Sequence, residues 1–240
     1  MSRSIVIEIT IQVVMDEELK QSMYQYYSQR APEYDLIYQG GIPASTSDPQ
    51  VYRDEVAILS DIVGDFCRGD LIDLACGTAF WLPRYGDRCS HITLFDQSQE
   101  MLAEARERVY SAGVTGRTTL LTGDVFDHDF GQTAYDCALV GFLLSHVTAQ
   151  QEADLFRSFK SIVKPKGVVL ILDSAWSDDR ARTRSKEGSQ MRTLADGRQF
   201  RIYKKHFTRD DLLAMKATHE IRLTIEHFGN VFFAARVTFE

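Results

Sequence analysis

The sequence has few cysteines, no long apolar run and no excess of basic residues, and each scarcity excludes a class of protein. Its four cysteines are scattered without a C-x-x-C pair, which argues against a zinc knuckle, a redox dithiol and a disulfide framework. The six histidines contain no H-E-x-x-H pattern, so no metal site is predicted. The most apolar stretch, Cys137–Leu144, is far shorter than the ~20 residues that cross a bilayer.

Acidic residues outnumber basic ones. Asp and Glu total 34 against 27 Lys and Arg, which gives a net charge of −7. Proteins that bind nucleic acid through its phosphates normally show the opposite balance, so no nucleic-acid partner is expected. Glu8, Thr10 and Gln12 interrupt the apolar N-terminal residues that a signal peptide would keep continuous. Together with the scattered cysteines, this predicts a cytoplasmic protein with no membrane span.

The sequence does have the composition of one well-filled globular core. Of its 240 residues 44% are hydrophobic and 25% are charged. Strand patterns alternate with helix patterns through the middle of the chain, which is typical of a parallel sheet covered on both faces. The expected strands are 71–74, 92–95, 119–121, 137–140 and 167–172, and the clearest helices are 99–111 and 149–163. Pro165, Lys166 and Gly167 are expected to form the turn into the last of these strands.

The two ends of the chain add further elements. A period-2 pattern over 5–13 predicts a strand, and 16–29 and 51–68 are expected to be helices. A helix over 210–219 precedes the strands 221–226 and 231–238, which the turn Gly229-Asn230 joins as an antiparallel hairpin.

One long charged stretch, residues 173–206, has no clear place in the sheet. Asp196-Gly197 predicts a hairpin turn within it. Its arginines either attract an acidic substrate or form a solvated face; they are Arg180, Arg182, Arg184, Arg192, Arg198 and Arg201.

Three acids, Asp73, Asp96 and Asp124, lie at the carboxyl ends of three successive predicted strands. Ligands of open parallel sheets bind at that edge. The small residues that follow Asp73 would allow a ligand to approach the backbone closely. The alternative is an ordinary strand-to-helix turn, which has the same residue pattern.

Asp96 is placed to accept both hydroxyls of a ribose, and Asp124 to accept from the amine of an adenine against which Val125 packs. The alternatives are a helix cap for Asp96 and a surface turn for Asp124.

A dinucleotide fingerprint, G-x-G-x-x-G, does not fit this site. Aligned on Gly77 it requires glycine at positions 75 and 80, where the chain has Ala75 and Phe80. NAD is therefore not expected to bind.

At these residues the sequence resembles the class I S-adenosylmethionine-dependent methyltransferases, specifically the small-molecule group related to ubiquinone/menaquinone methyltransferases. The resemblance extends from about Tyr24 to the C-terminus. It rests on segments 26–35, 71–78, 95–98 with Met101-Leu102, 123–124, 135–136, 142–147 and 170–172.

The resemblance implies an α/β fold with a Rossmann-like, seven-stranded, mostly parallel sheet, a C-terminal antiparallel hairpin and an N-terminal helical cap. Residues 1–50 would form an N-terminal strand and the cap segment. Residues 51–240 would form the methyltransferase domain, with an insertion at 173–206. Because a reactive sulfonium needs water excluded, residues 24–35 and 173–206 are expected to form a movable cover over the carboxyl edge of the sheet.

The family pattern after the first strand is acid-x-G-x-G-x-G, and here Ala75 and Ala79 replace the outer glycines. The methyl group of Ala79 is expected near the methionyl part of the cofactor. The resemblance implies S-adenosyl-L-methionine as cofactor, with Asp73 orienting the turn. The residues assigned to the cofactor are Tyr27, Tyr34, Asp73, Ala75, Gly77, Thr78, Asp96, Gln97, Met101, Asp124, Val125 and Gly141.

The reaction implied is direct displacement of the methyl group onto a small-molecule acceptor. If the nucleophile is a hydroxyl, His146 is the best-placed base, because histidine titrates near neutrality. The alternative for His146 is a residue that caps or packs at the start of the next helix. The rival functions are a non-catalytic S-adenosylmethionine-binding regulator, and methylation of tRNA or protein.

Overall fold

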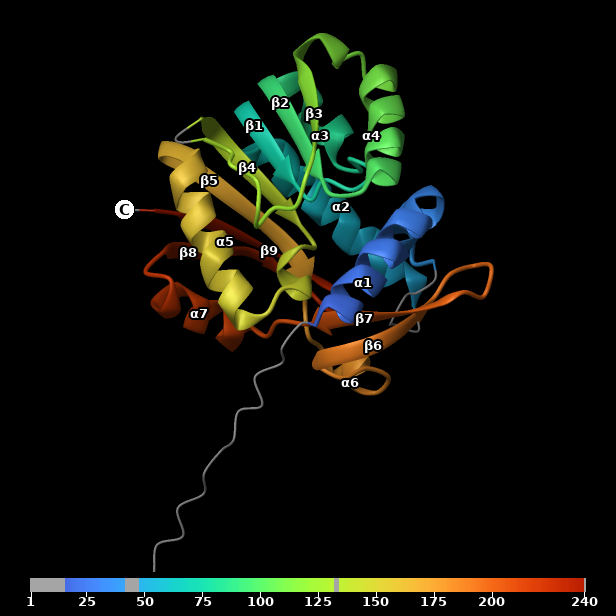
Figure 1. Ribbon diagram of the computed structural model, residues 1–240. Helices are drawn as coiled ribbons and strands as arrows, with labels where there is room; N and C mark the ends of the chain where they lie inside the picture. The colour runs from blue at the N-terminus through green and yellow to red at the C-terminus, as the bar shows by residue number, and fades with distance from the viewer. Residues whose placement is uncertain (1–15, 42–47, 132–133, 240) are drawn as a thin grey trace, which may run out of the picture.

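The computed structural model describes residues 16–41, 48–131 and 134–239 (Figure 1). Over these residues the main sheet has seven strands in the order β3-β2-β1-β4-β5-β9-β8. Its strands are β1 (Gly69–Leu74), β2 (Cys89–Asp96), β3 (Thr118–Thr122), β4 (Tyr135–Gly141), β5 (Val163–Ser174), β8 (Arg222–Phe228) and β9 (Phe232–Thr238). The first five strands pair in parallel, whereas β9 is antiparallel to both β5 and β8. This confirms the predicted fold class.

Helices cover both faces of this sheet. On one face pack α2 (Pro49–Phe66), α3 (Leu82–Tyr85) and α4 (Gln99–Ser111). On the other face pack α5 (Ala149–Ile162) and α7 (Arg209–Thr218). Neighbouring residues of β1 serve the two layers alternately: Leu71 packs with the first group and Ile72 with the second. Because both faces are buried, the central strands β4 and β5 are apolar at consecutive positions, over 137–140 and 168–172, rather than at every second one.

The helix boundaries follow from local capping. The Ser98 side chain accepts from the Met101 N–H and starts α4, while Thr148 and Gln151 form a capping box that starts α5. The remaining helical elements are α1 (Glu17–Arg30), α6 (Asp178–Ala181) and four short 3₁₀ helices, η1 (Ala31–Gln39), η2 (Gly86–Arg88), η3 (Thr115–Arg117) and η4 (Leu144–His146). None of the helices in the described part of the chain is long and apolar enough to cross a membrane.

A separate hairpin and the N-terminal helices together form a cover beside the sheet. Strands β6 (Glu187–Thr193) and β7 (Gln199–Lys205) pair antiparallel around the predicted Asp196-Gly197 turn. In Figure 1 the blue helix α1 lies beside the orange β6–β7 hairpin. Tyr26 of α1 is buried in one apolar cluster with Leu194 and Ile202 of the hairpin. Segments separated by about 170 residues thus support each other.

One prediction about an element boundary is wrong, and one predicted strand lies outside the described residues. Pro165, Lys166 and Gly167 were expected to form a turn before a strand at 167, but β5 already begins at Val163. The three residues instead make an irregularity inside the strand, where the pairing with β4 shifts register and Lys166 has φ 71°. The strand predicted over 5–13 lies outside the described residues.

Candidate active site

A cavity of about 340 Å³ opens at the carboxyl ends of the parallel strands. All but two of the predicted site residues line it: Tyr27, Tyr34, Ala75, Gly77, Asp96, Gln97, Met101, Asp124, Val125, Gly141 and His146. They come from α1, η1, α4, η4, the last residues of β2 and β4, and the loops after β1, β2 and β3. The three loops bearing the acids meet because their strands are neighbours in the sheet, in the order β3-β2-β1.

The loop after β1 keeps the backbone conformation that the family's glycines would favour. Ala75, Gly77 and Ala79 all have left-handed φ, at 54°, 56° and 54°. An L-residue in that region costs roughly 1–2 kcal/mol, so the two alanines hold the loop in a conformation that only tertiary contacts compensate. The Cys76 N–H donates to the Phe95 carbonyl at 3.0 Å, which ties the loop to β2.

Ala79 is not where the sequence predicted it. Its side chain is fully buried in the apolar cluster with Trp81 and Leu82. It does not line the cavity. The loop turns inward after Gly77, so the extra methyl group adds to the core and leaves the space for a methionyl group unchanged.

Asp96 ends β2 with a buried carboxylate that organises two loops. It accepts the Gly77 N–H at 2.8 Å and the Ser98 N–H at 2.9 Å. Burial raises its pKa, although the hydrogen bonds from the backbone act against that rise. The cap of α4 is Ser98, so the alternative of Asp96 as the helix cap is wrong.

Asp124 makes a turn and also faces the cavity. Its Oδ1 accepts the N–H of Phe126 at 2.9 Å, and the side chain is exposed. The predicted turn and the predicted cavity position are therefore compatible at this residue.

Asp73 and Thr78 do not line the cavity. The Tyr85 hydroxyl donates to the Asp73 carboxyl at 2.8 Å in the core. Thr78 donates to Asp35 at 2.7 Å, and Asp35 pairs with Arg108 at 2.6 Å. The two predicted residues therefore hold the loop from behind, one to α3 and the other to η1 and α4.

Replacing Asp73 with asparagine is expected to flatten the pH dependence of stability and leave cofactor affinity unchanged. Burial raises the pKa of Asp73 to about 7. The folded protein therefore retains a proton that the unfolded chain loses near pH 4, and this group's contribution to stability falls as pH rises to 7. Between pH 5 and 7 the wild type should lose about 2–3 kcal/mol relative to Asp73→Asn, measured by urea unfolding. The exposed Asp87→Asn serves as control, and equal slopes for the two variants would refute the assignment.

His146 stands where η4 meets the cover. Its Nδ1 lies 2.7 Å from the Tyr203 carbonyl oxygen, so Nδ1 carries the proton, and Nε2 accepts from the Tyr27 hydroxyl at 2.7 Å. Burial lowers the pKa of His146 well below its usual value, which keeps the ring neutral. Since Thr148 is the cap of α5, His146 is not a helix cap. Its role as a base stays a prediction.

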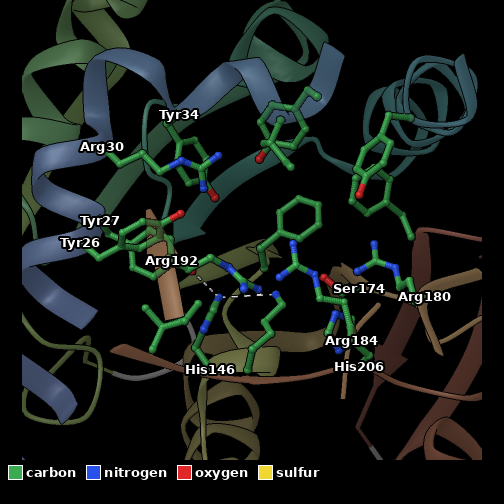
Figure 2. A pocket seen from close by; sticks show the side chains of 17 residues that line it. Tyr26, Tyr27, Arg30, Tyr34, His146, Ser174, Arg180, Arg184, Arg192 and His206 are labelled. Atoms are coloured by element: carbon green, nitrogen blue, oxygen red, sulfur yellow. Dashed lines mark hydrogen bonds between the residues drawn. The ribbon is translucent and has the colours of Figure 1, made fainter. Parts of the chain in front are cut away.

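A second, smaller cavity of about 90 Å³ adjoins the first (Figure 2). The two share Tyr27, Tyr34, Phe142 and His146 as their common wall. The predicted arginines divide here: Arg180, Arg184 and Arg192 line it, whereas Arg182, Arg198 and Arg201 do not.

Sequence reasoning missed Arg30, Lys204 and His206, which also line the small cavity. No local pattern marks Lys204 and His206. Lys204 lies in β7 and His206 directly after it, and the position of β7 depends on α1.

Comparison with known proteins agrees with this geometry. A sequence family described as a methyltransferase domain matches residues 71–167, from β1 into β5. The curated relatives include ubiquinone/menaquinone biosynthesis C-methyltransferase UbiE of Roseobacter denitrificans, which is 30% identical over 105 residues, 43% of this chain and 41% of that protein. The UbiE of Pseudomonas fluorescens is 27% identical over 106 residues. The chain thus spans about two-fifths of the length of these relatives.

Solved structures extend the likeness to nearly the whole chain. The DhpI–SAM–HEP complex has a TM-score of 0.76 at 26% identity, covering 94% of this chain and 100% of that one. The DhpI–SAH complex has a TM-score of 0.72 at 27% identity, covering 93% and 98%. The PH0226 protein from Pyrococcus horikoshii OT3 shares the fold, with a TM-score of 0.62 at 19% identity, covering 86% and 98%. With this fold and the loop after β1 in place, residues 71–167 match a methyltransferase domain, and nearly the whole chain is similar in structure to the DhpI complexes with SAM and SAH.

Proposed function

We propose that this chain transfers a methyl group from S-adenosylmethionine to a small-molecule acceptor. The observation that carries the proposal is the pair of adjoining cavities with one shared wall. The larger cavity, at about 340 Å³, has the size of a small-molecule cofactor site. The smaller one, at about 90 Å³, supplies a place for the acceptor on the other side of Tyr27 and His146.

The residues of the larger cavity fit the cofactor. A Cβ atom added at Gly77 would lie 3.8 Å from Tyr34 Cε1 and 3.9 Å from Met101 Sδ. The glycine therefore leaves a space that a bound group can fill. Asp96 would hold the ribose hydroxyls, with Gln97 and Met101 around the adenine. Asp124 and Val125 would meet its edge, and the backbone from Ala75 to Gly77 would face the methionyl group.

The protein's own contribution to such a reaction is positioning. The bound cofactor supplies an activated methyl group on a sulfonium sulfur. The aromatic wall and the cover of α1 and the β6–β7 hairpin align the acceptor and exclude water, and alignment of this kind supplies roughly 7–11 kcal/mol of barrier reduction. For a hydroxyl acceptor, His146 would take up the proton at Nε2, once the Tyr27 hydroxyl has moved away.

The small size of the smaller cavity favours a small molecule over tRNA or protein as acceptor. Tyr26, Tyr27 and Arg30 of α1 and residues of the hairpin line it, and its volume of about 90 Å³ suits a compact ligand. A second cavity beside the larger one also favours an enzyme with two ligands over a non-catalytic regulator. All four cysteines are free thiols, which supports a reducing, cytoplasmic compartment.

Calorimetry with the full chain tests the cofactor. We expect one equivalent of S-adenosylhomocysteine or S-adenosylmethionine to bind, and no heat with NAD, because the loop after β1 lacks the dinucleotide glycines. Binding of NAD without binding of either sulfur compound would overturn the proposal. Transfer of labelled methyl from S-adenosylmethionine to any acceptor separates the enzyme from the regulator.

A further inference from the structure

We propose that the methyl acceptor is a compact oxyanion, with a carboxylate or phosphoryl group held by Arg30, Arg180, Arg184 and Arg192 in the smaller cavity and methylated on its charged oxygen. The inference rests on the proposed function and names its substrate class. Figure 2 shows the side chains of Arg30, Arg184 and Arg192 reaching toward the same space from different elements.

The first argument is the pairing of the arginines. Within the described residues, none of these four guanidinium groups has a carboxylate within 4.0 Å. The outward-facing arginines of the same stretch, Arg182, Arg198 and Arg201, are each paired with an acid. The chain as a whole carries a net charge of −7, so acids are plentiful, yet no described Asp or Glu lines this cavity.

The second argument is burial. Arg30, Arg180 and Arg192 are only 6%, 4% and 9% exposed. Arg30 Nη2 and Arg180 Nε have no hydrogen-bond partner in the described structure. Guanidinium groups remain charged even when burial lowers their pKa, as it does for Arg180 and Arg192. Buried charges in proteins are normally paired, and an oxyanion would supply the missing acceptors in a geometry that arginine matches well.

Lys204 adds a fifth cation to this cavity. Its Nζ donates to Ser145 Oγ at 2.5 Å and lies 3.7 Å from Asp173 Oδ1. That single carboxylate does not balance the cluster, so the cavity keeps a positive excess.

The third argument concerns the proton. His146 and His206 both line the cavity, and burial together with Lys204 lowers the pKa of each, for His206 to about 2. A hydroxyl nucleophile would have to give its proton to one of these rings, which the surrounding cations disfavour. An acceptor that arrives already ionised needs no base.

The chemical step balances without one. A lone pair on the charged oxygen attacks the methyl carbon and forms the new C–O bond. The C–S bond breaks, and its electron pair stays on the sulfur as the sulfonium becomes a neutral thioether. The acceptor leaves as a methyl ester with one negative charge fewer, and no proton is transferred.

The small volume limits the acceptor's size. An engineered cavity of about 150 Å³ holds benzene, whereas this one has about 90 Å³. The acceptor therefore presents its anionic group and only a few carbon atoms.

Calorimetry on the protein saturated with S-adenosylhomocysteine tests the proposal. The probes are inorganic phosphate, acetate and neutral acetamide. We expect at least one anion to bind and acetamide not to bind; a preference for phosphate or for acetate identifies the phosphoryl or the carboxylate source. Binding of neither anion while S-adenosylhomocysteine binds normally would refute the oxyanion and leave the proposed function standing.

Two arginine variants give a matched comparison. Arg192→Gln should weaken anion binding at least tenfold, whereas Arg198→Gln, exposed on the same hairpin and paired with Asp196, should stay within twofold of wild type. Saturation with S-adenosylhomocysteine shows that each variant is folded, and Arg30→Gln replaces Arg192→Gln if that variant does not fold. If Arg192→Gln, or Arg30→Gln in its place, binds the anion as tightly as Arg198→Gln does, the assignment is overturned.

Discussion

Replacing Asp96 with asparagine should weaken S-adenosylhomocysteine binding by about a hundredfold. The carboxylate of Asp96 lines the larger cavity, and a hydrogen bond to a charged group contributes about 1.5–3 kcal/mol. Loss of the charge against two ribose hydroxyls thus removes about 3 kcal/mol. Asparagine keeps an oxygen for only one of the two backbone N–H groups that Asp96 accepts, so the fold should persist with a modest loss of stability. Calorimetry gives the affinity, and urea unfolding gives the stability.

Ser98→Ala is the matched control for this variant. Ser98 caps α4 through the Met101 N–H, so its loss should lower the free energy of unfolding by about 1 kcal/mol. Its cofactor affinity should change little. If Asp96→Asn instead loses stability and keeps its affinity, Asp96 only supports the loop and the ribose lies elsewhere.

Replacing Glu55 with alanine should lower the free energy of unfolding by about 3–5 kcal/mol at pH 7. Glu55 projects from α2 and is 6% exposed. Its carboxylate accepts the N–H groups of Asn230 and Phe232 at 2.7 and 2.8 Å, and also that of Val231. Alanine would leave three backbone donors without their partner at the turn between β8 and β9. Urea unfolding beside the exposed Asp61→Ala, on the same helix, measures the loss.

The pH dependence gives an independent check on Glu55. Burial opposes its ionisation, but His227, whose Nε2 lies 3.5 Å from the carboxylate, and hydrogen bonds from the backbone outweigh burial and lower its pKa. A carboxylate with a lowered pKa stabilises the fold above the unfolded-state pKa near 4.5 and loses that effect as the pH falls through the folded-state pKa. The gap between wild type and Glu55→Ala should therefore shrink in acid. A gap that stays constant down to pH 3 would contradict the ionic role.

Glu55 also bears on the acceptor cavity. The segment it holds includes Phe232, which lines that cavity, and Val231, whose carbonyl accepts from Arg180 at 2.8 Å. A loss of stability in this turn should therefore loosen one wall of the smaller cavity. The larger cavity, on the other side of the shared wall, depends on different loops.

Much of the sheet and of the cofactor cavity followed from local sequence. Alternating strand and helix patterns predicted the five parallel strands, and α4 was predicted at its observed bounds, 99–111. Asp96 and Asp124 could be placed because a residue just past a parallel strand has little choice of position. It must lie at the carboxyl edge, where the neighbouring loops meet.

The same local reasoning did not give the side-chain directions of residues that turn away from that edge. Asp73 lies close to the loop after β1, and Thr78 and Ala79 belong to that loop. The Asp73 side chain nevertheless contacts Tyr85, that of Thr78 contacts Asp35, and that of Ala79 is buried in the core. Their directions depend on the left-handed turns of the loop and on which helix packs behind it. Neither can be read from residue types alone.

The lining of the smaller cavity was decided by the tertiary structure. In β6 the apolar Met191 is 56% exposed while its neighbour Arg192 is 9% exposed, the reverse of what alternation of apolar and polar residues predicts. The hairpin takes this orientation because β7 packs Ile202 against Tyr26 of α1. The sequence by itself determined a methyltransferase-like sheet with its acids at one edge. Contacts between segments far apart in the chain turned three of six arginines inward, since a side chain's direction on a covering hairpin depends on what the hairpin packs against.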